Sequence, residues 1–103
     1  MTATAKMQNK VALVTGGGGA IGGASARLLA SEGAKVLVAD ERSETAEAVA
    51  QEINKAGGAA EPIAIDVADP SQCKAAVDAA VSAFGGLHVL VNVAAAVTPD
   101  APV

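Results

Sequence analysis

Aromatic residues, cysteine and histidine are scarce in this sequence of 103 residues. It holds one Phe and neither Trp nor Tyr, so its core must be built from Ala, Val, Leu and Ile. The single cysteine, Cys73, excludes a disulfide framework, and its place on an apolar stripe predicts a buried small side chain. The single histidine, His88, leaves no cluster for a metal, and no Ser/His/Asp or Cys/His spacing predicts nucleophilic catalysis. We expect His88 to be structural or exposed.

Positive charge and long apolar runs are also lacking. Seven Lys and Arg stand against eleven Asp and Glu, a net charge of −4, and they are scattered, which excludes a basic face for nucleic acid. No apolar stretch approaches the roughly 20 residues that cross a membrane, and the polar segment 1–9 lacks a signal-peptide core. We therefore expect a cytoplasmic protein with no nucleic-acid or membrane partner.

The most informative feature present is a glycine-rich break. The apolar, β-branched run 11–15 is typical of a buried parallel strand, and four glycines and a helix-forming segment follow it. Glycine permits close approaches that a Cβ blocks, and a helix N-terminus offers unpaired N–H groups, so the segment predicts a pyrophosphate cradle. Gly17, Gly19 and Gly22 satisfy the dinucleotide fingerprint G-x-G-x-x-G, although four glycines in a row satisfy many templates. A turn that only joins strand to helix is the alternative.

Three further apolar runs predict strands: 35–40, 63–67, and 89–92 with its continuation to 95. The first of them ends in Asp40, eighteen positions after Gly22, close to the spacing of about twenty expected for a ribose-binding acid. A carboxylate there accepts hydrogen bonds from ribose hydroxyls and repels the 2′-phosphate of NADP by about 1–4 kcal/mol. Glu41 adds negative charge, whereas the Arg42 guanidinium could hold a phosphate. The balance favours NAD.

Glycines punctuate two helices between the first three strands. The first helix begins near Ala20, stops at Gly33 and is expected to pack one apolar stripe on the sheet: Ile21, Ala24 and Leu28. The second begins near Ser43, stops at Gly57-Gly58 and repeats apolar residues at helical spacing: Ala46, Val49, Ala50 and Ile53.

The third helix carries the clearest end signals. Asp69 is placed as its N-cap, Pro70 at its first position and Gln72 to complete a capping box, and Gly85-Gly86 end it. Its expected core stripe consists of Cys73, Ala76, Val77, Ala80, Val81 and Phe84.

Strands that alternate with helices pair in parallel through right-handed crossovers. The expected fold is α/β, a Rossmann-like doubly wound sheet of order 3-2-1-4 with three helices. It forms one domain at 10–96, between the segment 1–9 and a tail at 97–103. Such sheets bind ligands at the carboxyl ends of their strands, where the order reverses. The candidate polar residues all fall at those ends: Asp40, Asp66 and Asn92.

The run Thr15–Gly22 resembles the Thr-Gly-x-x-x-Gly-Ile-Gly motif of the short-chain dehydrogenase/reductase family, with Ala20 in place of the middle glycine. The resemblance extends over residues 10–95. It implies a nicotinamide dinucleotide cofactor, for which we favour NAD over NADP. Six residues of the loop are expected to hold it: Gly16, Gly18, Gly19, Ala20, Ile21 and Gly22.

The same resemblance assigns the adenine side of the site. The family ends its third strand with an Asp-Val pair whose carboxylate bonds the adenine amino group, and Asp66 and Val67 stand there. A turn residue that accepts local N–H groups is the alternative for Asp66. The family motif Asn-Asn-Ala-Gly is matched by Asn92 and Ala94, while its second Asn and its Gly are replaced.

The resemblance covers only the first half of the family's pattern. The family's catalytic Ser and Tyr-x-x-x-Lys have no counterpart, since the chain has no Tyr. We expect the cofactor-binding portion of an oxidoreductase that transfers hydride between a nicotinamide cofactor and an alcohol or carbonyl substrate, truncated before these residues and inactive alone. Two alternatives stay open: a stand-alone NAD or ADP-ribose module, and an interaction protein with a vestigial loop.

The fourth strand lies at one edge of the expected sheet. Its apolar residues Val89, Leu90 and Val91 then form an open edge, and such edges recruit other chains. A domain of this size also has a limited core. We therefore expect marginal stability and self-association through this strand or the third helix.

Overall fold

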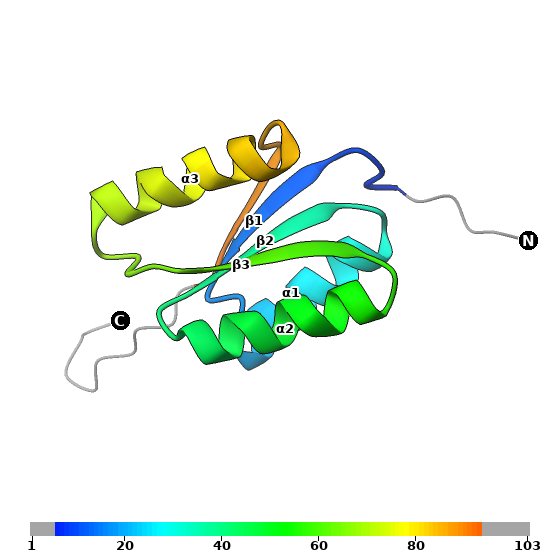
Figure 1. The fold of residues 1–103 in the computed structure, drawn as a ribbon, viewed down its shortest axis with the longest axis horizontal. Helices are drawn as coiled ribbons and strands as arrows, with labels where there is room; N and C mark the ends of the chain where they lie inside the picture. The colour runs from blue at the N-terminus through cyan, green and yellow to red at the C-terminus, as the bar shows by residue number, and fades with distance from the viewer. Residues whose placement is uncertain (1–5, 94–103) are drawn as a thin grey trace, which may run out of the picture.

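The computed structural model describes residues 6–93 and contains one parallel sheet with helices on both faces (Figure 1). The elements in chain order are β1 (Val11–Thr15), α1 (Ala20–Ser31), β2 (Lys35–Asp40), α2 (Ser43–Lys55), β3 (Ala59–Ala64), α3 (Pro70–Phe84) and β4 (Val89–Asn92). The strand order is β3-β2-β1-β4, and every pairing is parallel. The predicted Rossmann-like fold, its strand order and its three helices are confirmed.

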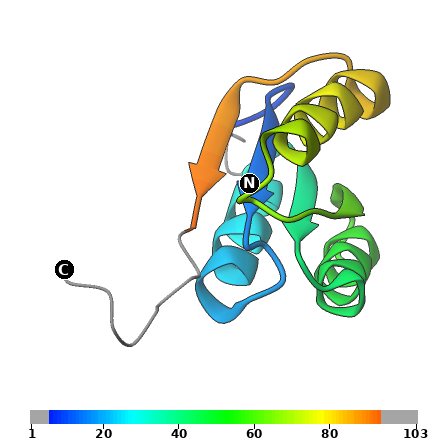
Figure 2. The same ribbon diagram turned by 90° about the vertical axis from the view of Figure 1, so that its left-hand side faces the viewer.

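Helices cover the two faces unequally. The helices α1 and α2 lie side by side under one face, and α3 lies alone over the other, where it packs on β1 and β2 (Figure 2). All five residues of β1 are buried, and so are the central four of β2, because these strands have a helix on each face. This accounts for their uninterrupted apolar sequence. Within residues 6–93 no helix is long and apolar enough to cross a membrane.

Three glycines end the helices at the predicted places. Gly33, Gly57 and Gly85 have φ angles of +100°, +94° and +88°, a left-handed conformation that side chains with a Cβ adopt rarely. The apolar stripe of α2 is also confirmed, since its four members are at most 5% exposed: Ala46, Val49, Ala50 and Ile53.

The third strand begins and ends earlier than predicted. The prediction of 63–67 is wrong, because β3 spans Ala59–Ala64 and includes Pro62. A proline lacks an N–H donor, but β3 is an edge strand with a neighbour on one side only, where that loss is tolerated. Asp66 and Val67 consequently lie beyond the end of the strand.

The apolar stripe predicted for α1 faces solvent. Ile21 is 72% exposed and Leu28 63% exposed, and the buried residues of the helix are Gly22, Gly23 and Ala26. The reason is a close approach of the helix to the loop that follows β1, because a Cβ at Gly22 would overlap the carbonyl oxygen of Gly16. The smallest side chains therefore mark the packed face.

The stripe predicted for α3 is buried only in part. Ala76 and Ala80 are inaccessible, whereas Val77 is 38% exposed and Val81 49% exposed. Cys73 is half-buried, not buried as we expected.

The N-terminus of α3 is capped differently from the predicted capping box. Asp69 is the N-cap and accepts the Ser71 N–H at 2.9 Å, as predicted. The Gln72 side chain, however, accepts the N–H of Asp66 at 2.7 Å and donates to the Asp69 carboxylate at 3.1 Å. The Gln72 side chain therefore links the segment between β3 and α3 to the first turn of α3.

Candidate functional site

The carboxyl ends of the strands bring several predicted residues together. Gly16 follows β1 directly, while Asp40 ends β2 and Asn92 ends β4, the strands on either side of β1. A small cavity of about 50 Å³ opens between these ends, and six residues line it: Gly16, Asp40, Glu41, Ile65, Val67 and Val93. Ile65, which sequence reasoning did not select for the site, is placed here by its N–H bond to the Asp40 carbonyl at 2.9 Å.

Asp66 faces a neighbouring hollow. That hollow has a volume of about 290 Å³ and is lined by Glu41, Ala64, Ile65, Asp66 and Gln72. Asp66 is exposed, and its carboxylate accepts the N–H of Ala68 at 2.9 Å, which is the bond expected of a turn residue. Ala94 lies outside the described residues.

Steric constraints explain why glycine fills particular positions of the loop. Gly16 has a φ of +68°, and a Cβ there would lie 3.1 Å from the Val93 carbonyl oxygen. A Cβ at Gly17 would lie 2.9 Å from both the Val14 carbonyl oxygen and a methyl of Val38. Gly19 is freer, since the nearest atom to its Cβ position is 3.5 Å away. The backbone therefore requires Gly16, Gly17 and Gly22 but not Gly19.

Some amides of the loop are bonded internally, and others precede the first helical bond. The Gly17 N–H donates to Ala39 O at 2.8 Å, and the Gly19 N–H donates to Gly16 O at 3.1 Å. The first bond of α1 runs from the Gly23 N–H to Gly19 O at 2.7 Å. The amides of residues 20–22 precede it, and no side chain in the described structure caps the helix. These amides and the helix dipole form a positive end suited to an anion.

Asp40 is half-buried and uses both carboxylate oxygens. Its Oδ2 accepts the N–H of Gly18 at 2.9 Å, and its Oδ1 accepts the N–H of Arg42 at 3.0 Å. A carboxylate has about four acceptor positions, so about two remain for a ligand. Asp40 therefore places a negative charge and about two unused acceptor positions beside the glycine loop that leads to the N-terminus of α1.

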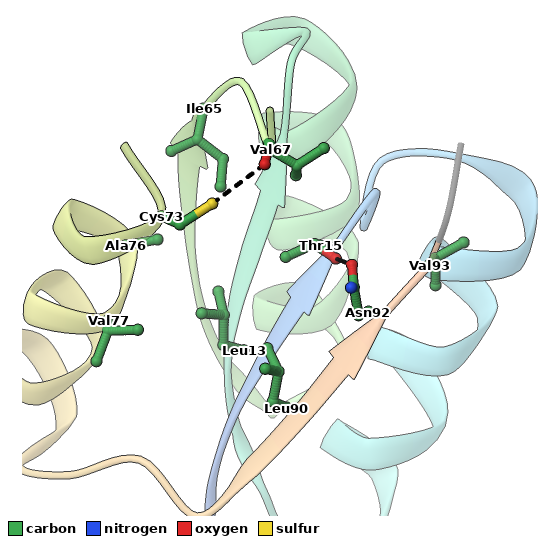
Figure 3. Close-up of a pocket in the computed structure, with 10 residues that line it drawn as sticks. All are labelled: Leu13, Thr15, Ile65, Val67, Cys73, Ala76, Val77, Leu90, Asn92 and Val93. Carbon is green, nitrogen blue, oxygen red and sulfur yellow. Dashed lines mark hydrogen bonds between the residues drawn. The ribbon is translucent and has the colours of Figure 1, made fainter. Parts of the chain in front are cut away.

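Thr15 and Asn92 join β1 to β4 beneath the loop. The Thr15 hydroxyl donates to the Asn92 side-chain oxygen at 2.7 Å (Figure 3). The Val93 N–H donates to Thr15 O at 3.3 Å. Thr15 is only 7% exposed, so this contact is part of the folded core. The sequence predicts that Asn92 binds the cofactor. In the structure, its side-chain oxygen accepts the hydrogen bond from Thr15. In the sequence, Thr15 stands out only as part of the Thr-Gly motif, and its position directly before Gly16 is the signal for this role.

A larger, mostly apolar cavity adjoins the site on the α3 face. It has a volume of about 340 Å³ and lies between α3, β1 and β4 (Figure 3). The Cys73 thiol lines it and donates to Val67 O at 3.4 Å. The other lining residues are Leu13, Thr15, Ile65, Val67, Ala76, Val77, Leu90, Asn92 and Val93. Within residues 6–93 no group of three or more His, Cys, Asp or Glu side chains could hold a metal.

Comparison with known proteins defines the class of this chain. The sequence profile of the family described as short chain dehydrogenase matches residues 10–103, so the chain belongs to that family. Its fold and the glycine loop agree with this membership.

Individual relatives are dehydrogenases. The chain is 46% identical over 94 residues to a 2,5-dichloro-2,5-cyclohexadiene-1,4-diol dehydrogenase of Sphingobium indicum, a match that covers 91% of this chain and 38% of the relative. It is 47% identical over 87 residues to a cyclohexanol dehydrogenase of Acinetobacter, covering 84% and 35%. Among solved structures, a hydroxysteroid dehydrogenase from Escherichia coli has a TM-score of 0.83 at 34% identity, covering 85% and 37%. The chain spans under two-fifths of the length of these relatives.

The family generally binds a nicotinamide dinucleotide, NAD or NADP. The residues of this chain fit such a group. A cavity opens beside Gly16 and Asp40, α1 begins without a side-chain cap, and Asp40 has acceptor positions to spare.

Proposed function

We propose that residues 10–96 form the cofactor-binding part of a short-chain oxidoreductase and that the cofactor is NAD. The observation that carries this proposal is the Asp40 carboxylate beside the uncapped N-terminus of α1. The pyrophosphate is assigned to the loop 16–22, the adenosine ribose to Asp40, and the adenine to Asp66 and Val67. Family membership and the cavity shared by Gly16, Asp40 and Val67 support the assignment.

The preference for NAD rests on charge. The 2′-phosphate of NADP would stand next to Asp40 and Glu41, a repulsion of about 1–4 kcal/mol for each close pair of charges. Arg42 opposes this effect with one exposed guanidinium. When bound, NAD supplies the hydride acceptor for oxidation of an alcohol. The chain's own residues bind and orient it.

Calorimetric titration with NAD and NADP tests the proposal. We expect NAD to bind more tightly than NADP. The Asp40→Ala variant should bind NAD more weakly, and the difference in affinity between NAD and NADP should become smaller. Asp78→Ala is the matched control, because Asp78 is an exposed carboxylate on α3 whose ion pair within residues 6–93 is with Lys74, at 3.0 Å. Equal affinity of the wild type for both cofactors, or an Asp40→Ala variant that binds NAD as well as the wild type, would contradict the Asp40 assignment.

We further propose that this chain alone does not turn over an alcohol. The family's phenol-based proton transfer needs a tyrosine, and the chain has none. Two relatives are named as a diol dehydrogenase and a cyclohexanol dehydrogenase, which supports alcohols as the substrate class of the whole enzyme. An absorbance assay for NADH over a panel of alcohols should give no signal from the purified chain. Robust turnover would require a different base among the residues present.

We also propose that copies of this chain associate through β4. Leu90 is 60% exposed on this strand, and β4 is at the edge of the described sheet. Exposed apolar residues continue onto α3 at Val77 and Val81. An apolar strand edge with free backbone donors and acceptors pairs readily with another strand.

A further inference from the structure

Asp40 lies where the glycine loop, the end of β2 and the start of α2 meet. We propose that Asp40, besides any bond to a ribose, is a positioning residue that fixes the glycine loop in its anion-binding shape before a ligand arrives. This inference rests on the proposed dinucleotide binding and adds a second role for the same carboxylate.

The hydrogen bonds of the Asp40 carboxylate join two segments of the chain. Oδ2 accepts the Gly18 N–H at 2.9 Å and Oδ1 accepts the Arg42 N–H at 3.0 Å, so one side chain ties the middle of the loop to the residue before α2. Hydrogen bonds to an ionised acceptor are the stronger kind. Removal of the carboxylate would release both amides at once.

The helix α2 packs against the glycine loop. A Cβ at Gly18 would lie 2.5 Å from the Thr45 hydroxyl oxygen and 2.8 Å from the Thr45 Cβ, so the first turn of α2 touches the loop at this residue. The Thr45 hydroxyl in turn donates to Arg42 O at 3.0 Å. Gly18 is therefore held from two directions, by Thr45 through contact and by Asp40 through its amide.

A functional consequence follows for the anion-binding amides. The amides of Gly17, Gly18 and Gly19 are all bonded within the protein, to Ala39 O, to Asp40 and to Gly16 O. The amides of residues 20–22 are left to a phosphate. With the Gly18 amide fixed, the loop reaches the start of α1 in one conformation, and a preformed site avoids the entropy of ordering a loop during binding. Loss of Asp40 should then weaken phosphate binding even for a ligand without ribose hydroxyls.

The test compares ADP with 2′,3′-dideoxyadenosine diphosphate, which keeps the diphosphate and lacks the diol. If the Asp40 carboxylate only binds ribose, Asp40→Ala should weaken the binding of ADP and leave the affinity for the dideoxy ligand unchanged. The positioning role predicts that Asp40→Ala weakens the dideoxy ligand as well, by about tenfold. Asp78→Ala should leave both affinities at the wild-type value. An unchanged dideoxy affinity in Asp40→Ala would overturn the inference.

A second measurement needs no variant. In the ligand-free wild type, amide hydrogen exchange at Gly18 should be slower than at Ile21, whose amide precedes the first helical bond. Fast exchange at both amides would contradict the positioning role, even if Asp40→Ala fails to fold. If the wild type binds neither ADP nor NAD, the proposed function fails, and the Gly18 exchange still decides whether Asp40 holds the loop.

Discussion

The two faces of the sheet differ in how completely helices cover them. On the face of α1 and α2, Val36, Val38 and Ile53 are at most 2% exposed. On the face of α3, Val77 and Leu90 are 38% and 60% exposed, and a cavity of about 340 Å³ separates α3 from β4. All five of these side chains are aliphatic. The difference shows that burial depends on which element lies opposite, not on the side chain alone.

The number and position of helices explain this difference. Two helices lie side by side under one face, whereas α3 packs on β1 and β2 and leaves β4 uncovered in the described structure (Figure 2). Close approach also contributes, because the glycines of α1 let that helix pack against the loop that follows β1. The α1–α2 face should therefore supply most of the folding free energy, and the α3 face should be available for binding and association.

Truncation of one apolar side chain on each face gives the largest expected effect. Ile53→Ala should lower the free energy of unfolding by about 2–5 kcal/mol, because a buried isoleucine leaves a cavity. Val81→Ala should cost under about 1 kcal/mol, since Val81 is 49% exposed and little area is lost. Urea unfolding monitored by circular dichroism measures both. Equal losses would show that the α3 face is covered in solution, for example by a second copy.

A charge on the β4 edge tests whether a second copy of the chain associates there. The expected effect is intermediate in size. Leu90→Lys should shift the protein towards monomer in light scattering and make its melting temperature independent of concentration, because an edge lysine opposes strand pairing. Leu28→Lys is the matched control, since Leu28 is 63% exposed but lies on α1. A wild type that is monodisperse and monomeric at all concentrations would refute association through β4.

The comparison also shows which parts of the fold the sequence could predict. The strands β1 and β2 and the helix α2 were predictable, because their apolar residues follow the periodicity of buried elements and glycines end the helices. The bounds of β3 were not, because Pro62 signals a break unless the strand is known to be at an edge. The packed face of α1 was missed because Gly22 and Gly23 have no side chain to give an apolar signal.

The candidate site, like the fold, could be predicted from the sequence only in part. The position of Asp40 follows from its spacing to the glycines and from the end of an apolar run. Its bonds to the Gly18 and Arg42 amides do not, since they depend on the conformation of two loops that are distant in sequence. The contact of Thr45 with Gly18 likewise arises only when α2 takes its place beside the loop.

The smallest expected effect concerns the N-terminus of α3, the helix on the less covered face of the sheet. Hydrogen bonds from the Ser71 side chain, the Gln72 side chain and the Ser71 backbone hold the pKa of Asp69 below its usual range. The ionised carboxylate is therefore favoured by folding, and its stabilisation is present above the unfolded pKa of about 3.9 and is lost as pH falls through the lower folded value.

Thermal melts of the wild type and Asp69→Ala between pH 7 and pH 2 measure this contribution. The wild type should melt at a higher temperature at neutral pH, and the gap should close as the pH falls below about 4. Asp78→Ala provides the comparison, because its pair with Lys74 is exposed at both partners and should contribute little at any pH. A gap for Asp69→Ala that stays constant down to pH 2 would mean that the carboxylate charge does not hold α3. The helix would then be fixed mainly by Ala76 and Ala80 against the sheet.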